Sequence, residues 1–132
     1  MKTIYYKIAA VLAFIIGAMA FVSGIQVLLG RDPGYHVLNW LPIYNYTMGF
    51  LTALVTAPLI WRSSKLAMPV ALTTTGLHML VMFILQTTYR DVVAAESIQA
   101  MTIRLVTWGV ILILMFIQTA KNKALKKATV PA

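Results

Sequence analysis

Four long apolar stretches constrain what this chain can fold into more than any other feature of its sequence. Dividing the sequence at its charged residues leaves these stretches at about residues 8–30, 41–61, 66–89 and 98–120. A helix rises about 1.5 Å per residue, so each is long enough to cross a hydrocarbon layer about 30 Å thick. They are continuous rather than short and alternating, which favours helices over strands. The sequence therefore predicts an all-α integral membrane protein, a four-transmembrane-helix bundle forming a single domain over residues 1–132.

The composition agrees with this fold class and excludes several others. Only 11% of the residues are charged and 61% are hydrophobic, whereas soluble domains carry about 25% charged residues. The chain has no cysteine, which excludes disulfides, thiolate-bound clusters and Cys-based zinc sites. The net charge of +8 lies at chain ends and short loops, which indicates a lipid surface rather than nucleic acid as the partner.

The basic residues predict how the spans are oriented, since loops rich in Lys and Arg stay in the cytoplasm. If the N-terminus is cytoplasmic, the inner side carries Lys2, Lys7, Arg62, Lys65, Lys121, Lys123, Lys126 and Lys127. The outer loops then hold a polar cluster of both charge signs, made of Arg31, Asp32, His36, Arg90, Asp91 and Glu96. We therefore expect both termini in the cytoplasm and a multi-pass protein of a bacterial inner (plasma) membrane.

Small residues recur every four positions in the first two spans. The first stripe is Ala9, Ala13 and Gly17, and the second is Gly49, Ala53 and Ala57. Membrane helices associate by close packing, which favours small residues on the contact face. We expect these two stripes to face each other, although contact with a second subunit would give the same pattern. Pro58 is expected to bend the second span.

Polar side chains inside the spans are costly in hydrocarbon and usually face the interior. Counting residues from the outer ends of the spans places His78 and Trp108 at one depth, near the membrane midplane, with Arg104 one turn above Trp108. The candidate ligand-binding residues are His78, Trp108, Arg104, Thr74, Gln86 and Asn45. They suggest a vestibule that opens outward, with its site between the third and fourth spans.

His78 and Arg104 each have a structural and a functional interpretation. A neutral His78 would tie helices together through a neighbouring hydroxyl such as that of Thr74, or it would bind a ligand, a proton or a cofactor. Arg104 would extend to the headgroups, bind an anionic ligand or, in the interpretation we favour, pair with Glu96 or Asp91.

No catalytic signature is present in the sequence. Paired intramembrane carboxylates, H-E-x-x-H, G-x-S-x-G and phosphate loops are all missing, which indicates a non-enzymatic protein. The leading hypothesis is a small membrane subunit or accessory protein that acts through helix–helix contacts in a larger or homo-oligomeric assembly. The second is a small-molecule binding or transport protein using the vestibule and His78. The third is a redox component that binds haem or a quinone near His78 and Trp108. A haem held by both histidines would require the loop of His36 to fold deep into the membrane. No motif assigns a cofactor, a metal or a family.

Overall fold

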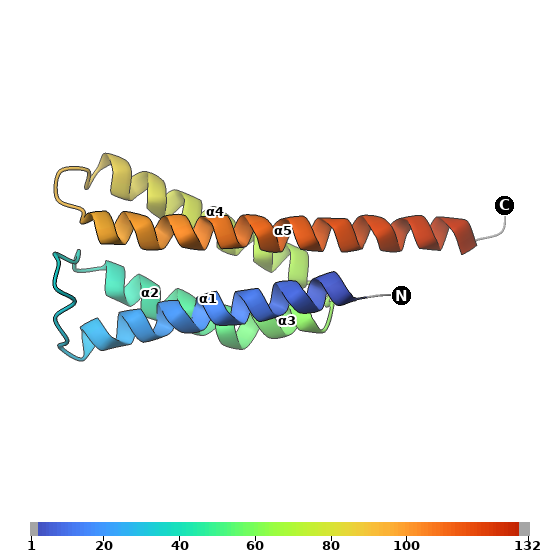
Figure 1. Cartoon of the computed structure of the whole chain (residues 1–132), viewed down its shortest axis with the longest axis horizontal. Coiled ribbons are helices and arrows are strands. Elements are labelled where there is room, and N and C mark those ends of the chain that lie inside the picture. The colour runs from blue at the N-terminus through green and yellow to red at the C-terminus, as the bar shows by residue number, and fades with distance from the viewer. Residues whose placement is uncertain (1–2, 130–132) are drawn as a thin grey trace.

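Figure 1 shows a computed structural model of the chain, which describes residues 3–129, so that Lys2 lies outside the described residues. Every element within this range is helical. In chain order they are α1 (Ile4–Leu28), α2 (Leu41–Leu51), the π-helix η1 (Thr52–Thr56), α3 (Ala57–Trp61), α4 (Ala67–Thr87) and α5 (Ala95–Thr129). Within the described range, four helical stretches are long and apolar enough to cross a membrane, as expected of a multi-pass membrane protein. The all-helical prediction with four candidate spans is confirmed.

The helices extend beyond the apolar stretches at the end where the two chain termini lie. The first helix begins at Ile4, before the predicted start at residue 8, and the last continues to Thr129, well past residue 120. Alanine, leucine and lysine are strong helix formers in water as well as in lipid. Charged residues in this chain therefore mark the edge of the apolar zone, while the helix itself continues.

The second span is a continuous helical stretch with a wide turn inside it. In η1 the hydrogen bonding shifts, and the amide of Ala57 donates to the carbonyl of Thr52, five residues back. Pro58 follows directly; it has no N–H, and its ring crowds the carbonyl four residues before it. A π turn widens the helix and is one of the recognised causes of helix irregularity. The structure thus accommodates Pro58 through η1, where the sequence predicted a bend.

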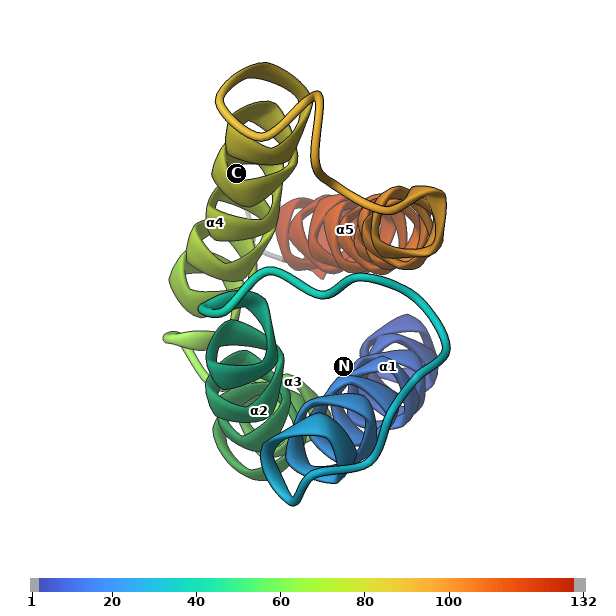
Figure 2. The ribbon, with the colours of Figure 1, turned by 90° about the vertical axis from the view of Figure 1, so that its left-hand side faces the viewer.

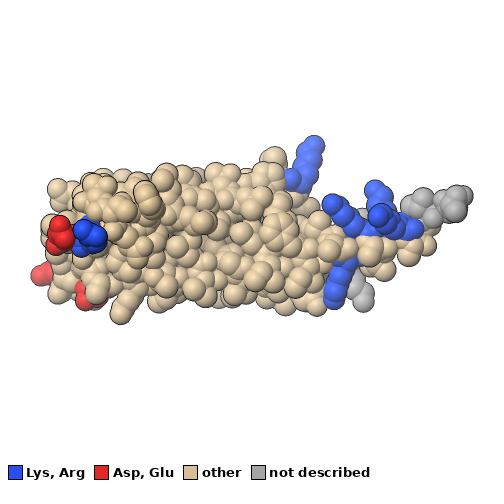
Figure 3. Space-filling model, turned by 90° about the horizontal axis from the view of Figure 1, so that it is seen from above, with Lys and Arg blue, Asp and Glu red and all other residues tan. Residues whose placement is uncertain are grey.

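The two ends of the molecule differ in charge (Figures 1 and 3). One end, here called the loop end, carries the connections 29–40 and 88–94. The other, the terminal end, carries the turn 62–66 and both chain termini. In Figure 3 the acidic side chains lie at the loop end, most of the visible basic side chains lie at the terminal end, and the surface between them shows neither.

The first two helices approach each other at backbone distance (Figure 2). A Cβ atom added to Gly49 would meet the amide nitrogen of Phe21 and lie 2.6 Å from the carbonyl oxygen of Gly17. A Cβ added to Gly17 would lie 2.9 Å from the amide nitrogen of Ala53. The absence of side chains at 17 and 49 therefore sets the separation of α1 and α2.

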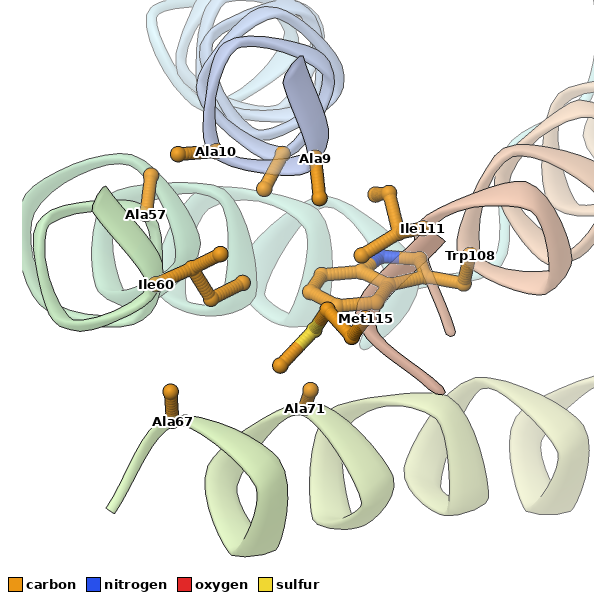
Figure 4. Close-up of a cluster of buried hydrophobic side chains, with 10 residues drawn as sticks. Ala9, Ala10, Ala57, Ile60, Ala67, Ala71, Trp108, Ile111 and Met115 are labelled. Carbon is orange, nitrogen blue, oxygen red and sulfur yellow. The ribbon is translucent and has the colours of Figure 1, made fainter. Parts of the chain in front are cut away.

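A large buried ring fills the space between the helices toward the terminal end (Figure 4). Trp108 is fully buried and is surrounded mainly by small side chains from α1, α3 and α4. The cluster comprises Ala9, Ala10, Ala13, Ala57, Ile60, Ala67, Ala71, Trp108, Ile111 and Met115. The alanines leave the volume that the indole ring needs in a close-packed interior.

Candidate functional site

Arg104 lies inside the protein, although it is a charged residue on one of the four helices that are long and apolar enough to cross a membrane. Its side chain is 6% exposed, and its Nη1 donates a hydrogen bond of 2.6 Å to Oδ1 of Asn45 in α2. Within residues 3–129 this is the only hydrogen bond of the guanidinium, and it forms no ion pair.

The predicted pairing of Arg104 with Glu96 or Asp91 is therefore wrong. Both acids are exposed at the loop end. Glu96 lies two turns before Arg104 on α5, roughly 12 Å away along the helix axis, while the guanidinium turns inward to α2. Extension of Arg104 to the headgroups is excluded by its burial as well.

His78 is paired with a residue that was not among the predicted site residues. Its Nδ1 shares a hydrogen bond of 2.6 Å with the hydroxyl of Tyr44 in α2, and the two rings meet edge-on. The Thr74 hydroxyl instead donates to the carbonyl of Val70 at 2.9 Å, as threonines in helices commonly do. Thr74 is therefore not the partner of His78, and the tie runs from α4 to α2.

Arg104 lines two small cavities. The first, here called the Arg104 cavity, measures about 30 Å³. Its polar lining comes from Ser23, Tyr35, Asn45, Ser97 and Arg104, and the rest of its lining is apolar. The second, the His78 cavity, measures about 10 Å³ and is lined by His78, Arg104, Trp108, Thr52 and several small or apolar residues. It has roughly the volume that a single water needs.

The Arg104 cavity does not lie where the sequence predicted the vestibule. Its walls come from α1, the loop that follows α1, α2 and α5, and no α4 residue lines it. From α4, only His78 reaches either of these two cavities. The predicted location between the third and fourth spans thus describes only part of the lining: α5 contributes to both cavities, α4 contributes His78 alone, and α1 and α2 supply much of the rest.

A wider groove opens beside α1 at the loop end. This α1 groove measures about 590 Å³ and is lined by Ala18, Met19, Val22, Ser23, Gln26, Val27, Arg31, Asp32, Pro33 and Tyr35. Three of these residues, Ser23, Val27 and Tyr35, also line the Arg104 cavity. The groove and the cavity are therefore neighbours separated by shared side chains.

Several predicted site residues lie away from these spaces. Gln86 is exposed on the last turns of α4. Of the predicted outer polar cluster, Arg31 and Asp32 line the α1 groove, while His36, Arg90, Asp91 and Glu96 are exposed and line neither cavity.

The packing does not fit the haem of the third hypothesis. His36 is exposed in a loop while His78 is buried and bonded to Tyr44. The cavity beside His78 is about 10 Å³, whereas pockets for even drug-sized molecules measure about 300–1,000 Å³. Within the described range, no group of three His, Asp or Glu side chains could hold a metal ion.

Sequence reasoning missed two of the residues that shape the site. Tyr44 was not among the predicted site residues, because a tyrosine near the end of a span is typical of the aromatic belt at the membrane interface. Ser97 precedes the predicted start of the fourth span at residue 98, yet it lies in the first turn of α5 and is buried. The available signal was helical spacing, because Ser97, Met101, Arg104 and Trp108 recur at intervals of three or four on one face.

The chain matches no protein-family model, no curated protein and no solved structure.

Proposed function

We propose that this chain is a non-enzymatic membrane protein that binds an anionic group on Arg104, in the half of the molecule nearest the loop end. The observation that carries the proposal is a buried guanidinium without a carboxylate partner in the described part of the chain. An arginine at the centre of a membrane helix costs about 2.5–3.5 kcal/mol on insertion scales. One neutral hydrogen bond, to Asn45, uses only one of the five N–H donors of a guanidinium. An anion in the Arg104 cavity would supply the missing charge.

The lining of the Arg104 cavity supports this assignment. Ser23, Tyr35 and Ser97 contribute hydroxyl groups that form no hydrogen bond with other described residues. No acidic side chain of residues 3–129 lines the cavity. Ser97 lies in the first turn of α5, where the helix dipole favours negative charge. These groups together offer donors and positive potential to an anion.

Anion binding is tested by thermal unfolding of the purified protein in a nonionic detergent. Formate is expected to raise the melting temperature at constant ionic strength, because a ligand that binds only the folded state stabilises it. Arg104→Gln is expected to abolish the shift. The matched control Arg90→Gln removes an exposed arginine of the loop end and is expected to keep it. A shift that persists in Arg104→Gln contradicts the proposal. The proposal is also contradicted if neither formate nor chloride, tested as a second anion, shifts the melting temperature.

The same proposal includes the orientation in a bacterial inner membrane, with four helices crossing as a bundle and both termini in the cytoplasm. It is supported by the gathering of basic side chains at the terminal end and of acidic ones at the loop end (Figure 3), as the positive-inside rule requires.

The orientation is tested by cysteine labelling, which is unambiguous because the chain has no cysteine of its own. Asp91→Cys at the loop end and Ala124→Cys on α5 place one thiol at each end of the molecule. A membrane-impermeant maleimide is expected to label position 91 in intact cells and position 124 only after permeabilisation. Labelling of both positions from one side, or of position 124 alone in intact cells, contradicts the orientation.

A role as a subunit of a larger or homo-oligomeric assembly is the second candidate. The closed centre of the molecule favours it over transport, because the cavities that adjoin Arg104 and His78 measure only about 30 and 10 Å³. Anion binding and subunit function are compatible. Purified protein that stayed monomeric in mild detergent and co-purified with nothing from native membranes would contradict the subunit role.

A further inference from the structure

We infer that the anion on Arg104 is the carboxylate of an amphiphile, whose apolar chain lies in the α1 groove. This inference rests on the proposed anion site and adds the chemical class of the ligand and the direction from which it arrives. It depends on three observations: the shared wall of the groove and the cavity, the apolar surface of the groove, and the small volume of the cavity.

The residues that the α1 groove and the Arg104 cavity share indicate the side from which a ligand reaches Arg104. Ser23, Val27 and Tyr35 line both the α1 groove and the Arg104 cavity. Ser23 is exposed on α1, and Tyr35 belongs to the loop that follows that helix. The side chains that the two spaces share therefore lie between a ligand in the groove and Arg104.

The groove itself suits an apolar chain with a polar end. Toward the membrane centre its lining is apolar, and Met19 and Val22 are 59% and 47% exposed. Toward the loop end its lining includes Gln26, Arg31 and Asp32. A molecule in this position would place its chain against the exposed apolar side chains of α1 and bring its polar end to Ser23 and Tyr35, which also line the Arg104 cavity.

The size and shape of the cavity favour a carboxylate head. A volume of about 30 Å³ is about two to three times what a single water needs, so it admits a flat three-atom carboxylate more readily than a five-atom tetrahedral phosphate. A guanidinium also binds a carboxylate through two parallel N–H···O bonds. With one donor already used on Asn45, the guanidinium retains enough donors for such a pair.

The experiment compares four probes in thermal unfolding of the full chain in mixed nonionic micelles. Laurate carries both the head and the chain, dodecanol only the chain, formate only the head, and dodecyl phosphate a larger anionic head. Laurate is expected to raise the melting temperature at the lowest concentration and formate only at much higher concentration, while dodecanol and dodecyl phosphate have no effect. Arg104→Gln is expected to remove the laurate effect.

A pair of variants separates the groove from the anion site. Val22→Trp fills the groove and is expected to raise the half-maximal laurate concentration about tenfold while leaving the formate effect unchanged. Val106→Trp makes the same change on the exposed face of α5, away from the groove, and is expected to change neither.

The outcomes distinguish the two levels of the proposal. If neither laurate nor formate has an effect, the anion site itself is overturned. A laurate effect that persists in Arg104→Gln overturns it as well. A normal formate effect with a laurate effect that is no stronger, or that survives Val22→Trp unchanged, overturns only the amphiphile. A dodecyl phosphate effect equal to that of laurate overturns the carboxylate head.

Discussion

Replacing Gly49 by alanine is expected to lower the free energy of unfolding by about 3 kcal/mol, the upper part of the range for overpacking a well-packed site. The new methyl group would meet the amide nitrogen of Phe21 and lie 2.6 Å from the carbonyl oxygen of Gly17. Both are backbone atoms of α1, so no side-chain rotation relieves the clash. The helices must separate, and the contacts between α1 and α2 weaken along their length. Titration of the detergent-solubilised protein with SDS, followed by circular dichroism, measures the loss.

Gly76 provides the matched control for this substitution. It lies in α4, and a Cβ added there meets nothing within 4 Å. Gly76→Ala is therefore expected to stabilise the protein by about 0.5–1 kcal/mol, because alanine is the better helix former. Equal effects of the two substitutions would show that backbone contact at Gly49 does not set the helix separation.

The helices were predictable from the sequence because one physical requirement determines them. Backbone polar groups in hydrocarbon must bond within their own segment, so a long apolar stretch has no alternative to a helix. The same requirement does not determine where the helix ends in water, and the end of α5 at Thr129 therefore lies beyond the predicted span. It also does not predict η1, where Pro58 alters the backbone hydrogen-bonding pattern without ending the helix.

The sequence predicted how deep the site residues lie along the helices, but not which neighbouring residues their side chains face. Counting along antiparallel helices put His78, Arg104 and Trp108 at nearby levels, and these three side chains line one small cavity. Their partners depend on how each helix is rotated and tilted, which no single helix encodes. Figure 1 shows α4 running obliquely to α5, a tilt that a count of residues leaves out. Asn45 and Tyr44, adjacent on α2, are consequently the partners of Arg104 and His78, in place of the predicted Glu96 and Thr74.

The hydrogen bond between Asn45 and Arg104 leads to the second large effect. Asn45→Leu is expected to lower the free energy of unfolding by about 2–3 kcal/mol, because a hydrogen bond to a charged group contributes about 1.5–3 kcal/mol. The substitution removes the only hydrogen-bond partner of Arg104 within residues 3–129 and leaves its charge buried. SDS titration of each variant in the absence of organic anions measures the change. Gln86→Leu, which removes an exposed amide on α4 without a hydrogen-bond partner among the described residues, is the control and is expected to change little.

The double variant Asn45→Leu/Arg104→Met distinguishes a lost hydrogen bond from lost packing. Replacing both members of a buried polar pair by apolar residues of similar size is often neutral or stabilising, whereas removing one partner alone is strongly destabilising. The double variant is therefore expected to recover most of the stability lost in Asn45→Leu, and to lose the formate effect. If the two substitutions were instead additive and destabilising, the leucine would have harmed the packing of α2, and the buried charge would not be what makes Asn45 necessary. Recovery of stability together with loss of formate binding would show that the chain keeps a costly arginine in its interior for a ligand rather than for the fold.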